Sequence, residues 1–317
     1  MTSAADRPSS VWAVPAKINL TLRVRGRLAN GYHALESLVA FADIGERLHV
    51  APAMADTAMA DTALADMALA DTALQFSVTG PMAAQLDTQG QGADNLVLRA
   101  VRALEAHCGR TLPVDMTLDK HIPVAAGLGG GSADAAACLR AVATLYELSL
   151  PADEISDLAA NLGADVPVCL SSQPAFMTDT GTQIRRLPDL PALDIVLVNP
   201  RAALSTAQVF AALGADSVLQ PAASPPARFA DSSELCRYLA SVGNDLSEAA
   251  QSLVPEIGQC LDGLARLDVL YAAMSGSGAS CFALVPSGAG AACAADYSAM
   301  HDRHWCVSGA LVNGGGG

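Results

Sequence analysis

The stretch Lys120-His-Ile-Pro-Val-Ala-Ala-Gly-Leu-Gly-Gly-Gly-Ser-Ala-Asp134 decides the fold. It follows an alternating apolar segment, residues 114–118, that predicts a strand, and it leads into a helix predicted over about residues 132–148. Four of its residues are glycines: Gly127, Gly129, Gly130 and Gly131. They leave no side chains where a phosphate must approach the backbone, so successive N–H groups can face one anion. With Ser132 as the expected helix cap, the loop and the helix N-terminus together predict a phosphate site.

Taken alone, a glycine-rich stretch is also compatible with a flexible loop that binds nothing. Two common nucleotide-binding fingerprints do not fit it. A Walker A loop ends in Gly-Lys-Ser/Thr, whereas no lysine follows Gly131, and the dinucleotide pattern GxGxxG/A requires glycine or alanine where Ser132 stands. We therefore expect neither a P-loop NTPase nor an NAD(P)-dependent enzyme.

The composition limits the classes of protein to which this chain can belong. The chain has 317 residues, of which 51% are apolar, and this length predicts two domains, which we place at residues 1–168 and 169–317. A net charge of −14 leaves no broad basic face for nucleic acid or an anionic membrane. Apolar runs of about 20 residues are absent from the sequence, and residues 1–10 lack a signal-peptide pattern. Eight cysteines without a CxxC pair indicate reduced thiols, so we expect a cytoplasmic protein.

Apolar periodicity and turn residues predict the other elements. Strands are expected over residues 11–24, 35–50, 75–80, 175–184, 194–198 and 280–285, and helices over residues 95–108 and 152–162. Asp94 or Asn95 is the expected cap of the first of these helices. Turns are expected at Asn30–Gly31 and at residues 43–46.

Residues 55–74 consist of four similar pentapeptides of the type Ala-Asp-Thr-Ala-Leu. A period of five matches neither a helix nor a strand, and it is too short for a solenoid. We interpret the segment as a loosely structured surface insertion between strands, which a fold tolerates because lengthening a loop costs little free energy.

Three motifs occur in order along the chain. They are Pro15-Ala16-Lys17-Ile18-Asn19-Leu20, Pro123-x-x-x-Gly127-Leu128-Gly129-Gly130-Gly131-Ser132-x-Asp134 and Met274-Ser275-Gly276-Ser277-Gly278-Ala279. Together they resemble the motifs of the GHMP kinases (galactokinase, homoserine kinase, mevalonate kinase and relatives). The resemblance implies a two-domain α+β fold, ribosomal protein S5 domain 2-like at the N-terminus and ferredoxin-like at the C-terminus. It also implies that the N-terminal domain binds ATP and that the active site lies between the domains.

Two further segments narrow the resemblance: Gly26-Arg27-x-x-Asn30-Gly31-Tyr32-His33 and Leu162-Gly163-Ala164-Asp165-Val166-Pro167. They look like the branch of the family that phosphorylates the 2-hydroxyl of a cytidine-diphosphate-linked methylerythritol, in the non-mevalonate route to isoprenoids. That branch uses ATP and Mg²⁺. Alternatives are a kinase of the homoserine or mevalonate type and a non-catalytic nucleotide-binding relative. The oligomeric state, monomer or homodimer, is left open.

The resemblance implies two catalytic residues. Asp165 is the expected base, which takes the proton of the attacking hydroxyl, and Lys17 is expected beside it, where it stabilises negative charge. A helix-end or turn residue is the alternative for Asp165, although the apolar residues 166–168 predict a partly desolvated carboxylate. A solvated lysine fits poorly in the apolar strand around Lys17. A non-catalytic relative should have lost one of the two residues, and both are present.

The resemblance also implies two sets of binding residues. The substrate is expected to contact Asn19, Tyr32, His33, Thr206 and Phe210, with the aromatic residues and His33 recognising cytosine. A surface hairpin is the alternative for Tyr32-His33, and a strand-end hydrogen bond is the alternative for Asn19. ATP is expected to contact Asn95, Lys120, Pro123, Gly127, Gly129, Gly130, Gly131 and Ser132, while residues 275–278 support the phosphate loop or the substrate's diphosphate. No carboxylate partner for Mg²⁺ is evident, so its ligands are unassigned and we expect the phosphates and water to hold it.

The insertion gives a first prediction. Deleting residues 55–74 should leave turnover and substrate affinity close to those of the intact chain, because a surface insertion contributes neither to the core nor to the site. Steady-state kinetics of the two chains, purified side by side, measure this. A loss of substrate affinity in the deleted chain would show that the segment takes part in binding.

Overall fold

The computed structural model describes residues 8–27, 33–53, 74–87, 95–213 and 224–313. Several predicted features lie outside these ranges: the turn at Asn30–Gly31, Tyr32 and residues 55–73 of the insertion, whose last residue, Leu74, is described. The chain divides into two compact units that alternate along the sequence. The first unit comprises Met1–Val14, Gly45–His121 and Gly131–Leu170, and the second comprises Pro15–Ile44, Ile122–Gly130 and Ser171–Gly317. The domain boundary predicted between residues 168 and 169 stays a prediction.

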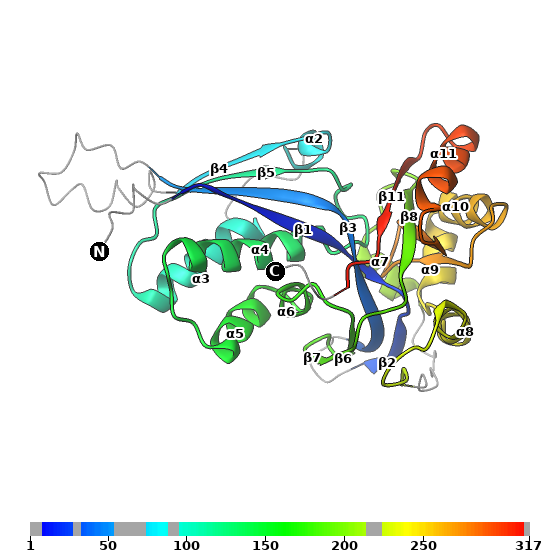
Figure 1. The fold of residues 1–317 in the computed structure, drawn as a ribbon, viewed down its shortest axis with the longest axis horizontal. Helices are drawn as coiled ribbons and strands as arrows, with labels where there is room; N and C mark the ends of the chain where they lie inside the picture. Colours follow the sequence, from blue (N-terminus) through cyan, green and yellow to red (C-terminus); the bar gives the residue numbers. More distant parts are fainter. Residues whose placement is uncertain (1–7, 28–32, 54–73, 88–94, 214–223, 314–317) are drawn as a thin grey trace, which may run out of the picture. The chain divides into compact units, whose positions relative to one another are not determined.

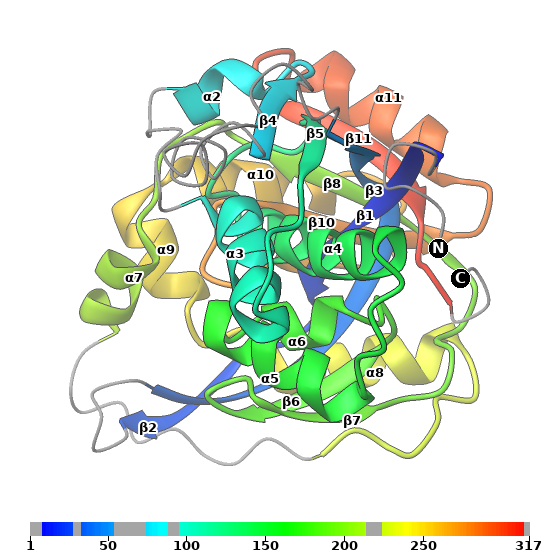
Figure 2. The ribbon, with the colours of Figure 1, turned by 90° about the vertical axis from the view of Figure 1, so that its left-hand side faces the viewer.

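The first unit is built around strands that carry one buried stripe of apolar side chains. The second half of β3 (His33–Pro52) pairs antiparallel with β5 (Val114–Asp119), and β4 (Leu74–Thr79) pairs parallel with β5 (Figure 2). Because side chains alternate along a strand, Leu48 and Val50 on β3 and Met116 and Leu118 on β5 are all buried on one face. β1 (Ser10–Asn19) also pairs with β3, and both strands pass from one unit into the other.

Helices complete the first unit. They are α2 (Ala83–Asp87), α3 (Leu96–Cys108), α4 (Gly130–Leu145), α5 (Ala152–Leu162) and α6 (Val166–Cys169). Helix α3 packs against α5 (Figure 2). The predictions for α3, including Asn95 as its cap, and for α5 are confirmed, because Asn95 Oδ1 accepts the N–H of Val97 at 2.9 Å and α5 covers residues 152–162.

The second unit contains a four-stranded antiparallel sheet in the order β11-β8-β10-β9. Its strands are β8 (Leu193–Asn199), β9 (Tyr271–Met274), β10 (Cys281–Pro286) and β11 (Trp305–Ala310). Helices α8 (Ser232–Val242), α9 (Ser247–Leu253) and α10 (Glu256–Ala265) lie between β8 and β9 in the sequence, and α11 (Gly290–Met300) lies between β10 and β11. The βαββαβ order and the strand order 4-1-3-2 confirm the ferredoxin-like prediction. α10 and α11 pack against this sheet (Figure 1).

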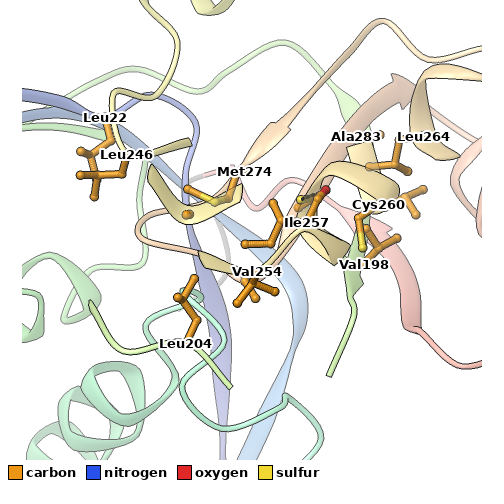
Figure 3. Packing of buried hydrophobic residues seen from close by; sticks show 14 of the residues in the cluster. Leu22, Val198, Leu204, Leu246, Val254, Ile257, Cys260, Leu264, Met274 and Ala283 are labelled. Carbon is orange, nitrogen blue, oxygen red and sulfur yellow. Dashed lines mark hydrogen bonds between the residues drawn. The ribbon is translucent and has the colours of Figure 1, made fainter. Parts of the chain in front are cut away.

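The core of the second unit forms where α10 meets the sheet. Ile257, Cys260 and Leu264 recur at helical spacing on one face of α10 and are completely buried (Figure 3). They belong to one apolar cluster with Val198 of β8 and Ala283 of β10, as the close view shows. This packed layer continues to Leu22, which precedes β2 (Arg23–Arg27). The first half of β3 pairs with β2 and with β6 (Ala175–Asp179), and β7 (Gln183–Arg186) pairs with β6.

Three predictions about strands and turns are wrong. The turn expected at residues 43–46 does not form, and β3 runs on as a continuous strand of 20 residues. Its polar residues find partners, since Asp43 accepts the N–H of Ala310 at 2.7 Å and Glu46 is buried against Lys120. The strand expected over residues 175–184 is divided into β6 and β7 by a turn at residues 180–182. The prediction for residues 11–24 also needs correction, because β1 ends at Asn19.

The helix after the glycine loop begins earlier than predicted. α4 starts at Gly130, so Ser132 lies inside its first turn and is not its cap, and the helix ends at Leu145. Asp134 consequently lies in the second turn of the helix. In the described ranges, none of the helices is long and apolar enough to cross a membrane.

Candidate functional site

The glycine loop takes a backbone conformation that side chains would obstruct. Gly127 and Gly129 have φ of 74° and 63°, in the left-handed region that favours glycine. A Cβ at Gly127 would lie 2.6 Å from the carbonyl oxygen of Gly278 and 2.7 Å from that of Ser275. The close approach between the second and third sequence motifs therefore requires glycine at position 127.

The buried hydroxyl of Ser275 joins all three motifs within the second unit. Its Oγ donates to the carbonyl oxygen of Gly127 at 3.0 Å and accepts the backbone N–H of Asn19 at 3.1 Å. A further bond runs from the N–H of Ser280 to the carbonyl oxygen of Ala126 at 3.1 Å. Because Ser275 is fully buried, these bonds are shielded from competing water.

Lys17 lies along the glycine loop. Its side chain is buried, and its backbone N–H donates to the carbonyl oxygen of Leu128 at 3.1 Å. A Cβ at Gly129 would lie 3.0 Å from Lys17 Cε and 3.1 Å from Lys17 Cβ. The absence of a side chain at position 129 thus makes room for the lysine, which ties the second motif to the first.

Asn19 follows Lys17 on the same face of β1 and is held from two sides. Its Nδ2 donates to the hydroxyl of Ser37 at 2.8 Å, and that hydroxyl donates to the carbonyl oxygen of Thr21 at 2.6 Å. On its other side, a Cβ at Gly276 would lie 3.2 Å from Asn19 Oδ1. Its orientation is therefore fixed beside the third motif. Its predicted contact with substrate stays a prediction.

Two of the residues predicted to recognise cytosine lie against each other. The rings of His33 and Phe210 stack with centroids 4.7 Å apart and planes inclined by 20°. Phe210 belongs to α7 (Thr206–Ala212), and the first residue of that helix, Thr206, shares a hydrogen bond of 2.8 Å between its hydroxyl and that of Ser277. The second unit thus places an aromatic pair and a hydroxyl pair next to the third motif.

Asp165 belongs to the first unit and immediately precedes α6. It occupies the N-cap position, as the helix-end alternative predicted, but its side chain accepts no capping hydrogen bond from that helix. Val166 and Val168, which follow it, are buried. The predicted pairing of its carboxylate with Lys17, a residue of the other unit, stays a prediction.

Among the predicted ATP-site residues, Lys120 has the most distinctive surroundings. Its ammonium Nζ lies 2.7 Å from Glu46 Oε2 and 2.9 Å from Asp134 Oδ2, and all three side chains are buried. Burial alone would lower the pKa of Lys120, but the two carboxylates outweigh it and the pKa is raised. Asn95 caps α3, and Pro123 is buried. The contacts of Asn95, Pro123 and Lys120 with nucleotide stay predictions.

Sequence reasoning missed Glu46 and the role of Asp134. A signal for Glu46 was present, because Glu46, Leu48 and Val50 share one face of a strand, and the two apolar residues mark that face as buried. An acidic residue on such a face requires a partner. Among the described residues, no group of three or more His, Cys, Asp or Glu side chains is arranged to hold a metal ion.

Comparisons with known proteins agree with this arrangement. The family model for the GHMP kinases N terminal domain matches residues 95–173, and that for the GHMP kinases C terminal matches residues 230–300. A protein of Ruegeria pomeroyi named 4-diphosphocytidyl-2-C-methyl-D-erythritol kinase is 42% identical over 303 residues, which cover 94% of this chain and 98% of that protein.

Solved structures show the same fold. A crystal structure of 4-(cytidine 5'-diphospho)-2C-methyl-D-erythritol kinase superposes with a TM-score of 0.72 at 29% identity, covering 98% of this chain and 100% of the other. Homoserine kinase from Cytophaga hutchinsonii superposes with a TM-score of 0.63 at 16% identity, covering 99% of this chain and 96% of that one. At that identity the second similarity concerns the fold alone.

The contact between Gly129 and Lys17 generates a prediction. Gly129→Ala should lower ATP turnover by about a hundredfold, because the added methyl group displaces the lysine and small displacements of positioned groups have effects of that size. Gly109→Ala is the matched control: Gly109 has φ of 64°, but no atom lies within 4 Å of its added Cβ. Steady-state kinetics and thermal melts of both variants separate the contact from backbone strain. Equal losses of activity would show that strain alone is responsible.

Proposed function

This chain belongs to the GHMP kinases, and on that premise we propose that it transfers the γ-phosphoryl group of ATP to the 2-hydroxyl of 4-diphosphocytidyl-2-C-methyl-D-erythritol. The reaction is a step in the non-mevalonate synthesis of isoprenoid precursors. The observation that carries the proposal is the similarity, over nearly the full length of both chains, to a kinase of that name. The three motifs, which the hydrogen bonds of Ser275 join, are the proposed site of this transfer.

The aromatic pair supports a cytidine-containing acceptor. Stacking on aromatic rings contributes about 1–3 kcal/mol per base, and an imidazole can also hydrogen-bond a base edge. Phe210 and His33 offer these two functions side by side, and Tyr32 is proposed as the second ring that encloses the cytosine. Homoserine and mevalonate contain no base that could use such a pair, which favours the cytidylated polyol over those acceptors.

The glycine loop is the proposed binding site of the ATP phosphates. Residues 127–132 combine side-chain-free backbone with the N-terminus of α4, which has 16 residues and therefore presents a full helix dipole. Mg²⁺ would enter with the nucleotide and neutralise its phosphates. Since the described residues provide no cluster of metal-binding side chains, its ligands from this chain stay unassigned.

Catalysis is proposed to rest on Asp165 and Lys17. Asp165 would take the proton from the acceptor hydroxyl as that oxygen attacks the γ-phosphorus in line with the departing ADP oxygen. Lys17 would stabilise the negative charge on the transferring group, and its burial makes that stabilisation stronger than it would be in water. The motif resemblance supports these two roles, and Asn19 would orient the acceptor beside Lys17.

A panel of acceptors tests the substrate. With ATP and Mg²⁺, phosphate transfer is expected to 4-diphosphocytidyl-2-C-methyl-D-erythritol and not to homoserine or mevalonate, because only the first carries a base for the aromatic pair. Labelled ATP and separation of the products measure the transfer. Transfer to homoserine or mevalonate alone would retain the kinase but refute the proposed substrate. ATP binding without transfer to any acceptor would favour a non-catalytic relative.

Replacement of the proposed base tests the mechanism. Asp165→Asn should lower kcat by about 10²–10⁴-fold, the range for a positioned base, while the cytidine ligand still binds. Asp157→Asn, which alters an exposed carboxylate of α5 in the same unit, is the matched control and should retain full turnover. Turnover of Asp165→Asn at the control's rate would remove Asp165 from this role.

A further inference from the structure

A buried cluster of charged side chains links the two ends of the phosphate loop. Lys120 is the first residue after β5, Asp134 lies in the second turn of α4, and the ion pair between them, at 2.9 Å, joins the two ends of residues 121–133. Glu46 of β3 contacts the same ammonium at 2.6 and 2.7 Å. We call Lys120, Asp134 and Glu46 the carboxylate clamp.

The register of the sheet explains how the clamp is assembled. Arg47 pairs with Asp119 across the antiparallel ladder, so the next residues along, Glu46 and Lys120, face each other on the opposite side of the two strands. That side is the buried one. The backbone of Lys120 is fixed as well, since its N–H donates to the carbonyl oxygen of Thr79 at 2.8 Å and its carbonyl accepts the N–H of Met82 at 3.1 Å.

The charges of the clamp do not balance if every group is ionised. Two carboxylates against one ammonium leave a net negative charge, and the three side chains are at most 5% exposed, so little water can stabilise it. In addition, Asp134 Oδ1 is buried and accepts no hydrogen bond from any donor of the described residues. A single proton between the two carboxyl groups would remove both defects, because it cancels the extra charge and supplies a donor.

We propose that Glu46 is a positioning residue of this kinase, which keeps one proton and shares it with Asp134, so that a neutral clamp holds the start of α4 against Lys120. The inference rests on the proposed function in one respect, because the element that it positions is the loop assigned to the ATP phosphates. The electrostatics of the site agree: burial, followed by the charge of Asp134 and a hydrogen bond with it, raises the pKa of Glu46 from 4.5 to about 10.

The surroundings contain few other titratable groups. Cys138, one turn beyond Asp134 on α4, is fully buried, and burial and the charge of Asp134 raise the pKa of its thiol, so it stays neutral. Arg47 and Asp119 alternate with Glu46 and Lys120 along their strands, so they point to the other side of the sheet. The charge balance of the clamp is therefore set by its own three side chains.

The pH dependence of stability tests the proton, without any substrate. The unfolded chain releases this proton near pH 4.5 and the folded chain near pH 10, so its contribution to stability is complete below pH 4.5 and is lost as the pH rises towards 10. The side-chain amide of Glu46→Gln does not titrate, so it donates a hydrogen bond at every pH. The unfolding temperature of Glu46→Gln minus that of the wild type should therefore rise by several degrees between about pH 5 and pH 9.

The matched control is Asp115→Asn, which alters an exposed carboxylate on the outer face of β5. The difference in unfolding temperature between Asp115→Asn and the wild type should stay constant over the same pH range. A difference for Glu46→Gln that stays flat or falls with pH would show that Glu46 is ionised, and would overturn the proposal.

Two further measurements test the shared proton independently, in case a single variant folds poorly. In the Asp134→Asn background, Glu46 becomes the sole counter-ion of Lys120, so adding Glu46→Gln should lower the unfolding temperature by more than it does in the wild type. In the infrared difference spectrum of wild type minus Glu46→Gln at pH 7, the carbonyl stretch of a protonated carboxylic acid should appear. Its absence contradicts the proposal even when the double variant does not fold.

Kinetics test the positioning role. Asp134→Asn should raise the KM for ATP about tenfold or more and change the KM for the acceptor less, since small displacements of a positioned element cost up to about a hundredfold. Glu46→Gln, which preserves the neutral clamp, should retain the wild-type KM for ATP. Equal changes in both KM values for Asp134→Asn would refute the positioning role. If the chain proves inactive with every acceptor, the proposed function fails, while the stability and infrared results still decide the state of the proton.

Discussion

The hydroxyl of Ser275 accepts the N–H of Asn19 and donates to the carbonyl oxygen of Gly127, and the described geometry of the second unit's site follows from these two bonds. A glycine-rich loop has more backbone entropy to lose than any other segment of its length. It keeps one conformation only where its backbone groups have fixed partners. Ser275 provides such a partner inside the protein, where an unmet hydrogen bond costs about 1–3 kcal/mol.

Close packing also explains why the motifs contain several glycines, because different neighbours exclude a side chain at different positions. Gly127 is needed because the carbonyl oxygens of Ser275 and Gly278 leave no space for a methyl group, whereas Gly129 is needed because Lys17 occupies that space. Gly276 faces the amide of Asn19 in a similar way. The glycines that make the backbone accessible to phosphate therefore also allow the residues proposed for catalysis to approach the loop.

Local sequence predicted the features whose causes are local. The spacing of glycines predicted the loop, and Asn95 predicted the start of α3, because a cap acts on the N–H two residues away. The prediction failed where a partner lies far along the chain. Asp43 and Glu46 looked like a turn, but their partners are Ala310 and Lys120, which lie far along the chain. The shared burial of Glu46, Leu48 and Val50 along one strand was the available clue.

The use of lysine follows from these contacts. The chain has 18 lysines and arginines, and only Lys17 and Lys120 are lysines. Both are buried, one beside Gly129, where an added Cβ would lie about 3 Å from the lysine side chain, and the other between two carboxylates on different elements. An ammonium is a compact charge whose three donors can turn toward separate acceptors, whereas a guanidinium is a broad planar fork suited to one carboxylate or phosphate. In an acidic chain that otherwise uses arginine, the two lysines therefore stand where the packing admits only the smaller cation, and an arginine at position 120 would force Glu46 and Asp134 apart.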